Sequence, residues 1–144
     1  MKITLLLCAM ILLGLGVNAQ KLTDADIPVA VKNKFSSMYP TIKVVNWEKE
    51  NDNYKAEFKY NSKQTTVVIE ASGYYLQTET EISVSDLPVK VTDYLKRNVD
   101  GKTISMAIKI ENAPGDINYK TNIEDEVYLF DRFGDFLSKE KAEK

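Results

Sequence analysis

The chain carries one sequence pattern twice, about 60 residues apart, and this repeat limits the folds that it can adopt. Residues 26–31 (DIPVAV) align with residues 86–91 (DLPVKV), and residues 67–73 (VVIEASG) align with residues 128–134 (YLFDRFG). In both copies the final glycine is followed, after one residue, by an aromatic residue and a leucine. Because the two blocks keep their order and nearly the same spacing, we expect one structural unit that is used twice.

Each unit is expected to begin with a helix. Pro28 and Pro88 suit the first turn of a helix, where a missing N–H costs nothing, and an aspartate precedes each of them by two residues. The apolar residues that follow have helical spacing, which predicts one buried stripe per helix. The stripes are Ile27, Val31, Phe35 and Met38 in the first unit and Leu87, Val91, Tyr94 and Leu95 in the second. The Tyr-Pro pair at 39–40 and the Asp-Gly pair at 100–101 are expected to end the helices.

After each helix the apolar spacing changes to two, which is typical of half-buried β-strands. The clearest examples are residues 54–60 and residues 104–110. In the second of these, the predicted apolar face is formed by Ile104, Met106, Ile108 and Ile110. Turn-forming residues separate the segments, so we expect about four antiparallel strands per unit, with the helix covering one sheet face. The predicted fold class is α+β, with one unit in residues 20–82 and the other in residues 83–144.

Residues 1–19 have the layout of a secretory signal peptide. Lys2 supplies the positive start, residues 3–15 form an apolar run, and Ala19 ends a small-residue cleavage motif. The run is shorter than the roughly 20 residues that a membrane span needs. We therefore expect cleavage after Ala19, a periplasmic or secreted protein, and no stable membrane insertion afterwards. Cys8, the single cysteine, lies too early in this segment for lipid attachment, so no disulfide is expected in the mature chain.

The composition excludes several classes of chemistry. Histidine is absent and the cysteine lies in the expected signal peptide, so Ser-His-Asp and Cys-His catalysis and His/Cys zinc sites lack their residues. No glycine-rich phosphate loop is present. The 19 basic and 21 acidic residues are interspersed, without the basic stripe that nucleic-acid binding requires. We expect no catalytic, cofactor or metal site and no nucleic-acid partner.

Carboxylates leave one enzymatic alternative open. Glu57 with Glu70, and Asp131 with Asp135, could perform acid–base chemistry on cell-wall or glycan material. A solvated strand face with lysine neighbours explains the same pattern. Residues 124–126 could bind calcium through their oxygens, or they could form an acidic hairpin tip. A structural envelope protein without a discrete ligand is a further alternative.

Aromatic residues supply candidates for a binding surface. Tyr74 and Phe133 flank the two glycine turns, where burial is difficult, and Trp47 could lie either in the core or on a binding face. Accessible aromatic residues at a sheet rim are typical of protein-binding surfaces. Together with the strand residues Lys55 and Glu57, these are the residues that we expect to contact a protein or peptide partner.

The order of these motifs resembles that of the PepSY-like, beta-lactamase-inhibitor-like periplasmic proteins of Bacteroidetes-type bacteria. The resemblance rests on a Leu/Ile-Pro-x-x-Val helix start, a strand with a tryptophan, a strand that begins with tyrosine, and an apolar strand that leads to Gly-x-aromatic-Leu; it covers residues 24–140. It implies that the two units adjoin into one curved sheet with the helices on one face. Together with the one-sided strands and the missing catalytic residue types, it favours a non-catalytic exported binding module, which could inhibit or regulate an envelope or secreted enzyme through the open sheet face.

Overall fold

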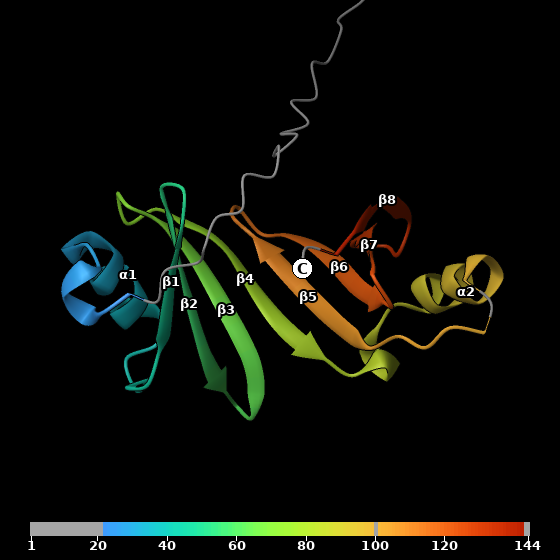
Figure 1. Ribbon diagram of the computed structural model, residues 1–144, viewed down its shortest axis with the longest axis horizontal. Coiled ribbons are helices and arrows are strands. Elements are labelled where there is room, and N and C mark those ends of the chain that lie inside the picture. The colour runs from blue at the N-terminus through green and yellow to red at the C-terminus, as the bar shows by residue number, and fades with distance from the viewer. Residues whose placement is uncertain (1–21, 100, 143–144) are drawn as a thin grey trace, which may run out of the picture.

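The computed structural model describes residues 22–99 and 101–142 (Figure 1). The expected signal peptide and its cleavage position lie outside these residues. The first unit consists of η1 (Asp24–Asp26), α1 (Val29–Met38), β1 (Asn46–Glu50), β2 (Asn53–Tyr60), β3 (Lys63–Glu70) and β4 (Tyr75–Ile82). The second unit consists of η2 (Val84–Asp86), α2 (Val89–Asn98), β5 (Met106–Asn112), β6 (Asp116–Ile123), β7 (Glu126–Asp131) and β8 (Phe136–Lys141).

The strands form one antiparallel sheet of eight strands in sequence order, from β1 to β8. The two units join where β4 pairs with β5, in register from Gln77–Asn112 to Ile82–Ala107. Figure 1 shows α1 and α2 at opposite ends of the molecule, with β4 and β5 between them. The predicted α+β fold, a helix-plus-antiparallel-sheet unit used twice, is confirmed.

Both helices cover the same face of this sheet. Ile82 pairs with Ala107, and both contribute to the core beneath α2. Thr78 lies four residues earlier on β4, and hence on the same sheet face, where it pairs with Val67 of the core beneath α1. Among the described residues no helix covers the opposite face, which confirms the predicted one-sided arrangement.

Each unit has its own core between helix and sheet. The predicted helix stripes are confirmed at the positions nearest the sheet, since Val31 and Val91 have no exposed surface. The buried residues of the first core are Ile27, Val31, Phe35, Trp47, Tyr54, Ala56, Phe58, Val67 and Ile69. Those of the second core are Leu87, Val91, Leu95, Val99, Ala107, Ile123, Tyr128 and Phe130. The sheet is therefore one continuous layer over two separate cores.

The helix boundaries differ from the predicted ones by one or two residues. Pro28 and Pro88 are N-cap residues with ψ of 143° and 139°, so the helical turns begin after them. Asp26 belongs to the short turn η1, where its carboxylate accepts hydrogen bonds from the backbone N–H and hydroxyl of Thr23, and these bonds lower the pKa of Asp26. The second helix ends at Asn98, before the predicted Asp-Gly stop at 100–101.

The apolar alternation of β5 does not face the second core. Ala107 is buried beneath α2, whereas Met106, Ile108 and Ile110 lie on the opposite sheet face, and Met106 is 39% exposed. Alternation shows that a strand has two unlike faces, but it does not show which of them the helix covers. Here the pairing of Ile82 with Ala107 decides the orientation, and the larger apolar residues are turned away from the helix.

The two glycine turns of the repeat hold each helix close to the sheet. Gly73 and Gly134 have φ of +88° and +84°, a conformation that disfavours other residues. A Cβ atom at Gly73 would lie 3.0 Å from the carbonyl oxygen of Ala30, and one at Gly134 would lie 2.9 Å from Cβ of Lys90. Ala30 and Lys90 occupy the same place in the first turn of their helices, so both units place a glycine where helix and turn meet.

Candidate functional site

The sheet face opposite the helices is the candidate binding surface, and we call it the open face. Its side chains come from alternate residues of each strand. They include Asn46 and Glu48 of β1, Lys55, Glu57 and Lys59 of β2, Thr66, Val68 and Glu70 of β3, Gln77, Glu79 and Glu81 of β4, Met106, Ile108 and Ile110 of β5, Asn118, Lys120 and Asn122 of β6, Val127, Leu129 and Asp131 of β7, and Ser138 and Glu140 of β8.

An ion pair crosses the middle of the open face. Nζ of Lys120 lies 2.7 Å from Oε2 of Glu79, and only 26% and 23% of these side chains are exposed. Gln77 donates a hydrogen bond of 2.7 Å to the other oxygen of Glu79. Because Glu79 belongs to the first unit and Lys120 to the second, this pair connects the two units across β5. Its partial burial protects it from salt better than a fully exposed ion pair.

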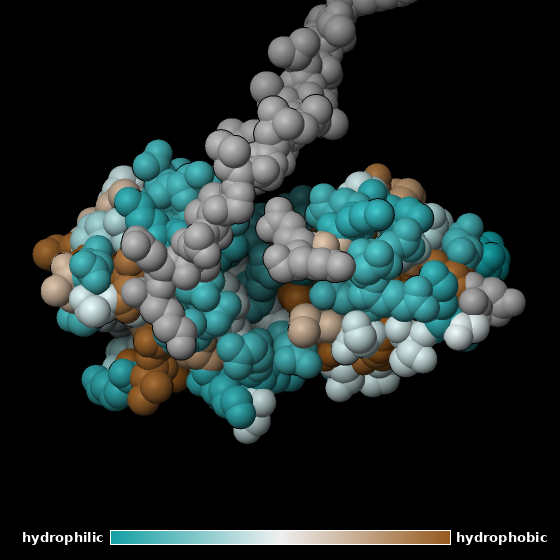
Figure 2. All heavy atoms as spheres, viewed as in Figure 1, coloured by the Kyte–Doolittle hydropathy of each residue, from teal (hydrophilic) through white to brown (hydrophobic). Residues whose placement is uncertain are grey.

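The two halves of the open face differ in polarity. In the first unit, β2 presents the charged residues Lys55, Glu57 and Lys59. In the second unit, β5 and β7 present Ile108 and Leu129 on either side of Lys120, to which both are paired in register. Where the surface in Figure 2 is not drawn in grey, hydrophilic residues cover much of it, and hydrophobic residues form separate patches toward both ends. The open face therefore combines a charged half with a mixed half.

Three of the predicted binding residues lie on β1 and β2, but not on the same face. Lys55 and Glu57 are half-buried on the open face. Their charges are engaged locally: Lys55 lies 2.8 Å from the carboxylate of Glu50, and Glu57 accepts a hydrogen bond of 3.3 Å from the amide of Asn46. Trp47 is only 7% exposed and belongs to the first core beneath α1. Its side chain is therefore part of the packing and not of the open face.

The other two predicted residues, Tyr74 and Phe133, are 59% and 66% exposed. They lie in the β3–β4 and β7–β8 turns, which the alternating strand direction places at the same end of the sheet. The five predicted residues thus occupy three places: the open face, the end of the sheet and the first core. Contact of Lys55, Glu57, Tyr74 and Phe133 with a partner stays a prediction.

Sequence reasoning missed two of the residues at the middle of the open face. Glu79 was not singled out. Ile108 was assigned to the apolar face of a half-buried strand, but the pattern did not indicate on which side of the sheet that face lies. The signal that identifies them is the pairing of β4 with β5, which needs the register across the join between the units. That register cannot be read from either repeat alone, because each repeat specifies only its own strands.

The candidate acid–base carboxylates have structural partners. Glu57 faces Thr66, and Glu70 faces the first residue of β2, so the two lie four residues apart along β3, or about 13 Å. Asp131 accepts hydrogen bonds from the backbone N–H groups of residues 133 and 135, which fixes the β7–β8 turn. Asp135 forms an ion pair of 3.1 Å with Lys90 of α2. These contacts hold turns and strands in place.

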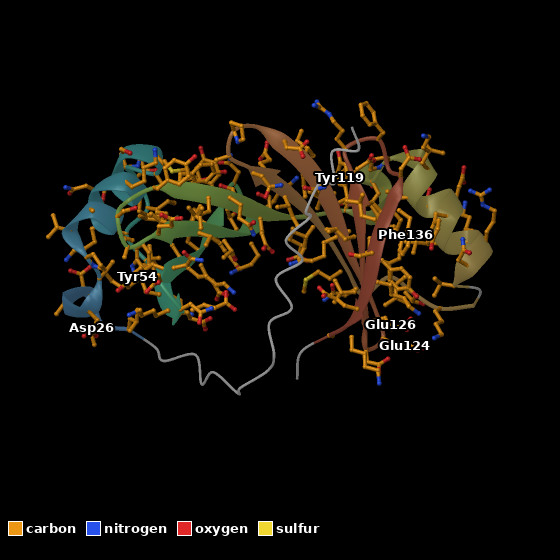
Figure 3. The ribbon with its side chains drawn as sticks, turned by 90° about the horizontal axis from the view of Figure 1, so that it is seen from above. Asp26, Tyr54, Tyr119, Glu124, Glu126 and Phe136 are labelled. Atoms are coloured by element: carbon orange, nitrogen blue, oxygen red, sulfur yellow. The ribbon has the colours of Figure 1, made fainter. Side chains whose placement is uncertain are left out.

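Two acidic residues at the turn between β6 and β7, Glu124 and Glu126, form ion pairs with lysines of the same chain; both are labelled in Figure 3. Glu124 lies 2.8 Å from Nζ of Lys102, and Glu126 lies 2.8 Å from Nζ of Lys139. Glu126 also accepts a hydrogen bond of 2.6 Å from the hydroxyl of Tyr128. The bonds from Lys139 and Tyr128 lower the pKa of Glu126, and the bond to Glu126 raises the pKa of Tyr128 to about 12. Within residues 22–99 and 101–142, no group of three or more acidic residues could hold a metal ion.

Comparisons with known proteins agree with the fold. A putative periplasmic protein from Bacteroides eggerthii has a TM-score of 0.72 at 17% identity, over 79% of this chain and 88% of that chain. A DUF2874 family protein from Bacteroides ovatus has a TM-score of 0.68 at 20% identity, over 79% and 86%. A BLIP-like protein from Bacteroides fragilis has a TM-score of 0.63 at 22% identity, over 78% and 84%. At these identities the likeness concerns the fold alone.

A search of curated proteins finds no match. Among the described residues, no helix has the length and apolar character that crossing a membrane would require. The sequence model of the family described as "Putative beta-lactamase-inhibitor-like, PepSY-like" matches residues 16–72 and again residues 60–138. Two matches to the same family model are consistent with the internal repeat. The chain belongs to this PepSY-like, beta-lactamase-inhibitor-like family.

Proposed function

We propose that the chain is a non-catalytic exported binding module, which takes a protein or peptide partner on the open face of its sheet. The observation that carries this proposal is the one-sided cover of the sheet: both helices lie on one face, and the open face extends across eight strands. The signal-like sequence of residues 1–19 and the periplasmic description of a structural neighbour support export to the periplasm. The BLIP-like neighbour supports an inhibitory or regulatory role toward an envelope or secreted enzyme.

The chemistry of the open face suits a protein partner. Its middle holds the half-buried Glu79–Lys120 pair, and Ile108 and Leu129 are partly accessible beside it. Interfaces of this kind combine a desolvated centre with a polar rim. The charged residues Lys55 and Glu57 would form part of that rim, where charges guide association more than they add affinity.

The test compares two variants that place the same large cation on opposite sides of the sheet. Thr66→Arg alters the open face, and Ser36→Arg alters the exposed side of α1. Each folded variant and the unaltered protein are immobilised and exposed to envelope extract of the native host. A partner recovered by the unaltered protein is then purified and titrated calorimetrically against all three.

We expect Thr66→Arg to lower the affinity for the purified partner at least about tenfold, because it places a large charged side chain in the interface. Ser36→Arg is expected to leave affinity unchanged. If the partner is an enzyme, stoichiometric addition of the unaltered protein should change its rate, and Thr66→Arg should abolish that change. Equal binding by Thr66→Arg, or no partner above background with a folded protein, would contradict the proposal.

A further inference from the structure

The second unit contains a pocket beside the C-terminal half of its helix. Its volume is about 320 Å³, at the small end of the range for ligand sites. It lies between the C-terminal half of α2, the segment that leads into β5, and the end of β6. The lining residues include Leu95, Lys96, Val99, Lys102 and Ile123.

In the first unit the equivalent positions are filled by aromatic rings. Leu95 corresponds to Phe35 by the repeat, and Ile123 corresponds to Phe58 by strand register. The rings of Phe35 and Phe58 are in edge contact, with centroids 5.1 Å apart. Tyr39, the C-cap of α1, packs on Phe58 with centroids 4.7 Å apart, whereas the C-cap of α2 is a valine. Replacing three rings by aliphatic side chains leaves the space that forms the pocket.

A fourth replacement enlarges the difference. Trp47 pairs with Ala56 and packs edge-on against Phe35, with centroids 5.3 Å apart. The corresponding residue of the second unit is Ala107, which is buried but carries only a methyl group. The helix α2 keeps its place on the sheet, because the Gly134 turn fixes its N-terminal end. The C-terminal half of α2 therefore lies over smaller side chains at these four positions.

The walls and the rim of the pocket indicate the chemistry of a ligand. The walls are apolar, with Leu95, Val99 and Ile123 buried at the inner side. Two cations, Lys96 and Lys102, stand among the lining residues. Lys102 is paired with Glu124, whereas Lys96 forms no ion pair with any residue that the structure describes. An apolar cavity with lysine side chains among its lining residues favours an apolar chain that ends in an acid.

We propose that this pocket binds a medium-chain fatty acid, with the alkyl chain among the aliphatic residues and the carboxylate at Lys96. Several methylene groups fit a cavity of this size, and each contributes about a fourfold gain in affinity when it leaves water. The site lies on the helix-covered side of the sheet, so it does not rest on the proposed function of the open face.

The experiment titrates decanoate into the purified protein at neutral pH, below its critical micelle concentration. Calorimetry gives the affinity, and methyl resonances in NMR spectra give the location. We expect saturable one-to-one binding with shifts centred on Leu95, Val99 and Ile123. Octanoate, shorter by two methylene groups, should bind roughly 15-fold more weakly.

Ile123→Phe supplies the ring that Phe58 provides in the first unit and should reduce the affinity for decanoate at least about tenfold by filling the pocket. Val99→Tyr, which supplies the ring of Tyr39, makes the same test if Ile123→Phe fails to fold. Lys96→Gln should lower the affinity for decanoate about threefold and leave the affinity for decanol unchanged. Arg97→Gln removes the same charge from a residue outside the pocket lining, so it should change neither affinity.

Absence of saturable binding would overturn the proposal, as would shifts centred on the open face or on Trp47. Unchanged decanoate affinity in the folded Ile123→Phe or Val99→Tyr variant would also overturn it. An effect of Arg97→Gln equal to that of Lys96→Gln would remove the assigned role of Lys96 at the rim.

Discussion

The two units have the same backbone plan and fill it with different side chains. In the first unit, Phe35 contacts the rings of Tyr39, Trp47 and Phe58. In the second unit, the rings are displaced toward the sheet edge, where Tyr94 stacks on Phe136 with centroids 4.8 Å apart and an interplanar angle of 6°. Equal topology thus coexists with unequal packing, because the repeat specifies helix, turn and strand register more strictly than it specifies side-chain volume.

The features that both units keep show where the fold permits least variation. Both place a valine with no exposed surface in the first turn of the helix and a positive-φ glycine in the turn against that helix. Both end the helix at a residue with an extended φ, −132° at Tyr39 and −135° at Val99. These shared features set the distance and angle between helix and sheet. The rest of the core can change in size while the backbone stays the same.

The largest effect is expected at Trp47. Trp47→Ala gives the first unit the residue that the second unit has at Ala107. It should lower the free energy of unfolding by about 3–5 kcal/mol, since the neighbouring rings can fill the cavity only in part. Urea denaturation measures the change. Tyr74→Ala, which removes an exposed aromatic residue from the same unit, should change it by less than about 0.5 kcal/mol. A loss below that of a typical surface variant would show that the first core does not depend on its aromatic packing.

The glycine turns come next, because they are the part of the comparison in which the two units agree. Gly73→Ala and Gly134→Ala should each cost about 1–3 kcal/mol, through the positive φ and the contact with the helix. Gly101→Ala and Gly115→Ala are the controls: their φ angles are also positive, but a Cβ meets nothing within 4 Å, so only the backbone cost of about 1 kcal/mol remains. Equal losses at all four positions would show that helix contact contributes nothing at the turns.

A smaller effect of opposite sign is expected at Thr121. Its side chain has no exposed surface, and its hydroxyl has no hydrogen-bond partner among the described residues. The first unit has Ala56 at the corresponding position. Thr121→Val removes the unmatched hydroxyl at nearly constant volume and should raise the free energy of unfolding by about 1 kcal/mol. Thr65→Val, which removes a hydroxyl that contacts the carbonyl of Lys63 at 3.4 Å, should not stabilise. Destabilisation by Thr121→Val would indicate a bound partner for its hydroxyl.

The smallest effect is a dependence of stability on pH, which we expect from ionisable groups of the second unit. The hydrogen bond to Glu126 raises the pKa of Tyr128 from 10.0 to about 12. The contribution of the Tyr128 hydroxyl to stability is therefore complete below pH 10 and is lost as the pH rises toward 12. The pKa of Glu126 is lowered from 4.5, so its contribution is present above pH 4.5 and is lost as the pH falls below that value.

Urea denaturation of the unaltered protein and of Tyr128→Phe over this pH range checks the alkaline part. The stability difference between them should be constant up to pH 10 and should shrink toward pH 12. The first unit has Val67 at the corresponding position, so the alkaline effect belongs to the second unit. A difference that stays constant through pH 12 would contradict the assigned hydrogen bond.

The sequence was sufficient to predict the architecture, and the reason is the duplication. A single proline or glycine motif is a weak signal. The same motif at matching positions of both copies, as at Pro28 and Pro88 or at Gly73 and Gly134, is a stronger one. Local periodicity also predicted the buried helix stripes. The orientation of β5 was not predictable in this way, since Met106 and Ala107 both fit a strand and only the pairing with Ile82 decides between its faces.

The candidate surface was predictable in part. Lys55 and Glu57 follow from strand alternation once the helix side of β2 is known. Trp47 was left open between core and surface, and its burial depends on contact with Phe35, which lies on a different element. The Glu79–Lys120 pair joins residues that are 41 positions apart and depends on three strands being in register. Sequence patterns carry no direct information about such a contact.

The sequence-order sheet described above leaves β1 and β8 as its two outer strands. The junction between the units uses the same antiparallel hydrogen bonding as the interior of each unit, so joining a second unit requires no new kind of contact. Gene duplication can lengthen such an assembly one helix-plus-sheet module at a time, and each addition widens the uncovered surface without rebuilding the existing cores. The architecture is in this sense extensible, and substitutions in one module can change its interior while its neighbour preserves the fold.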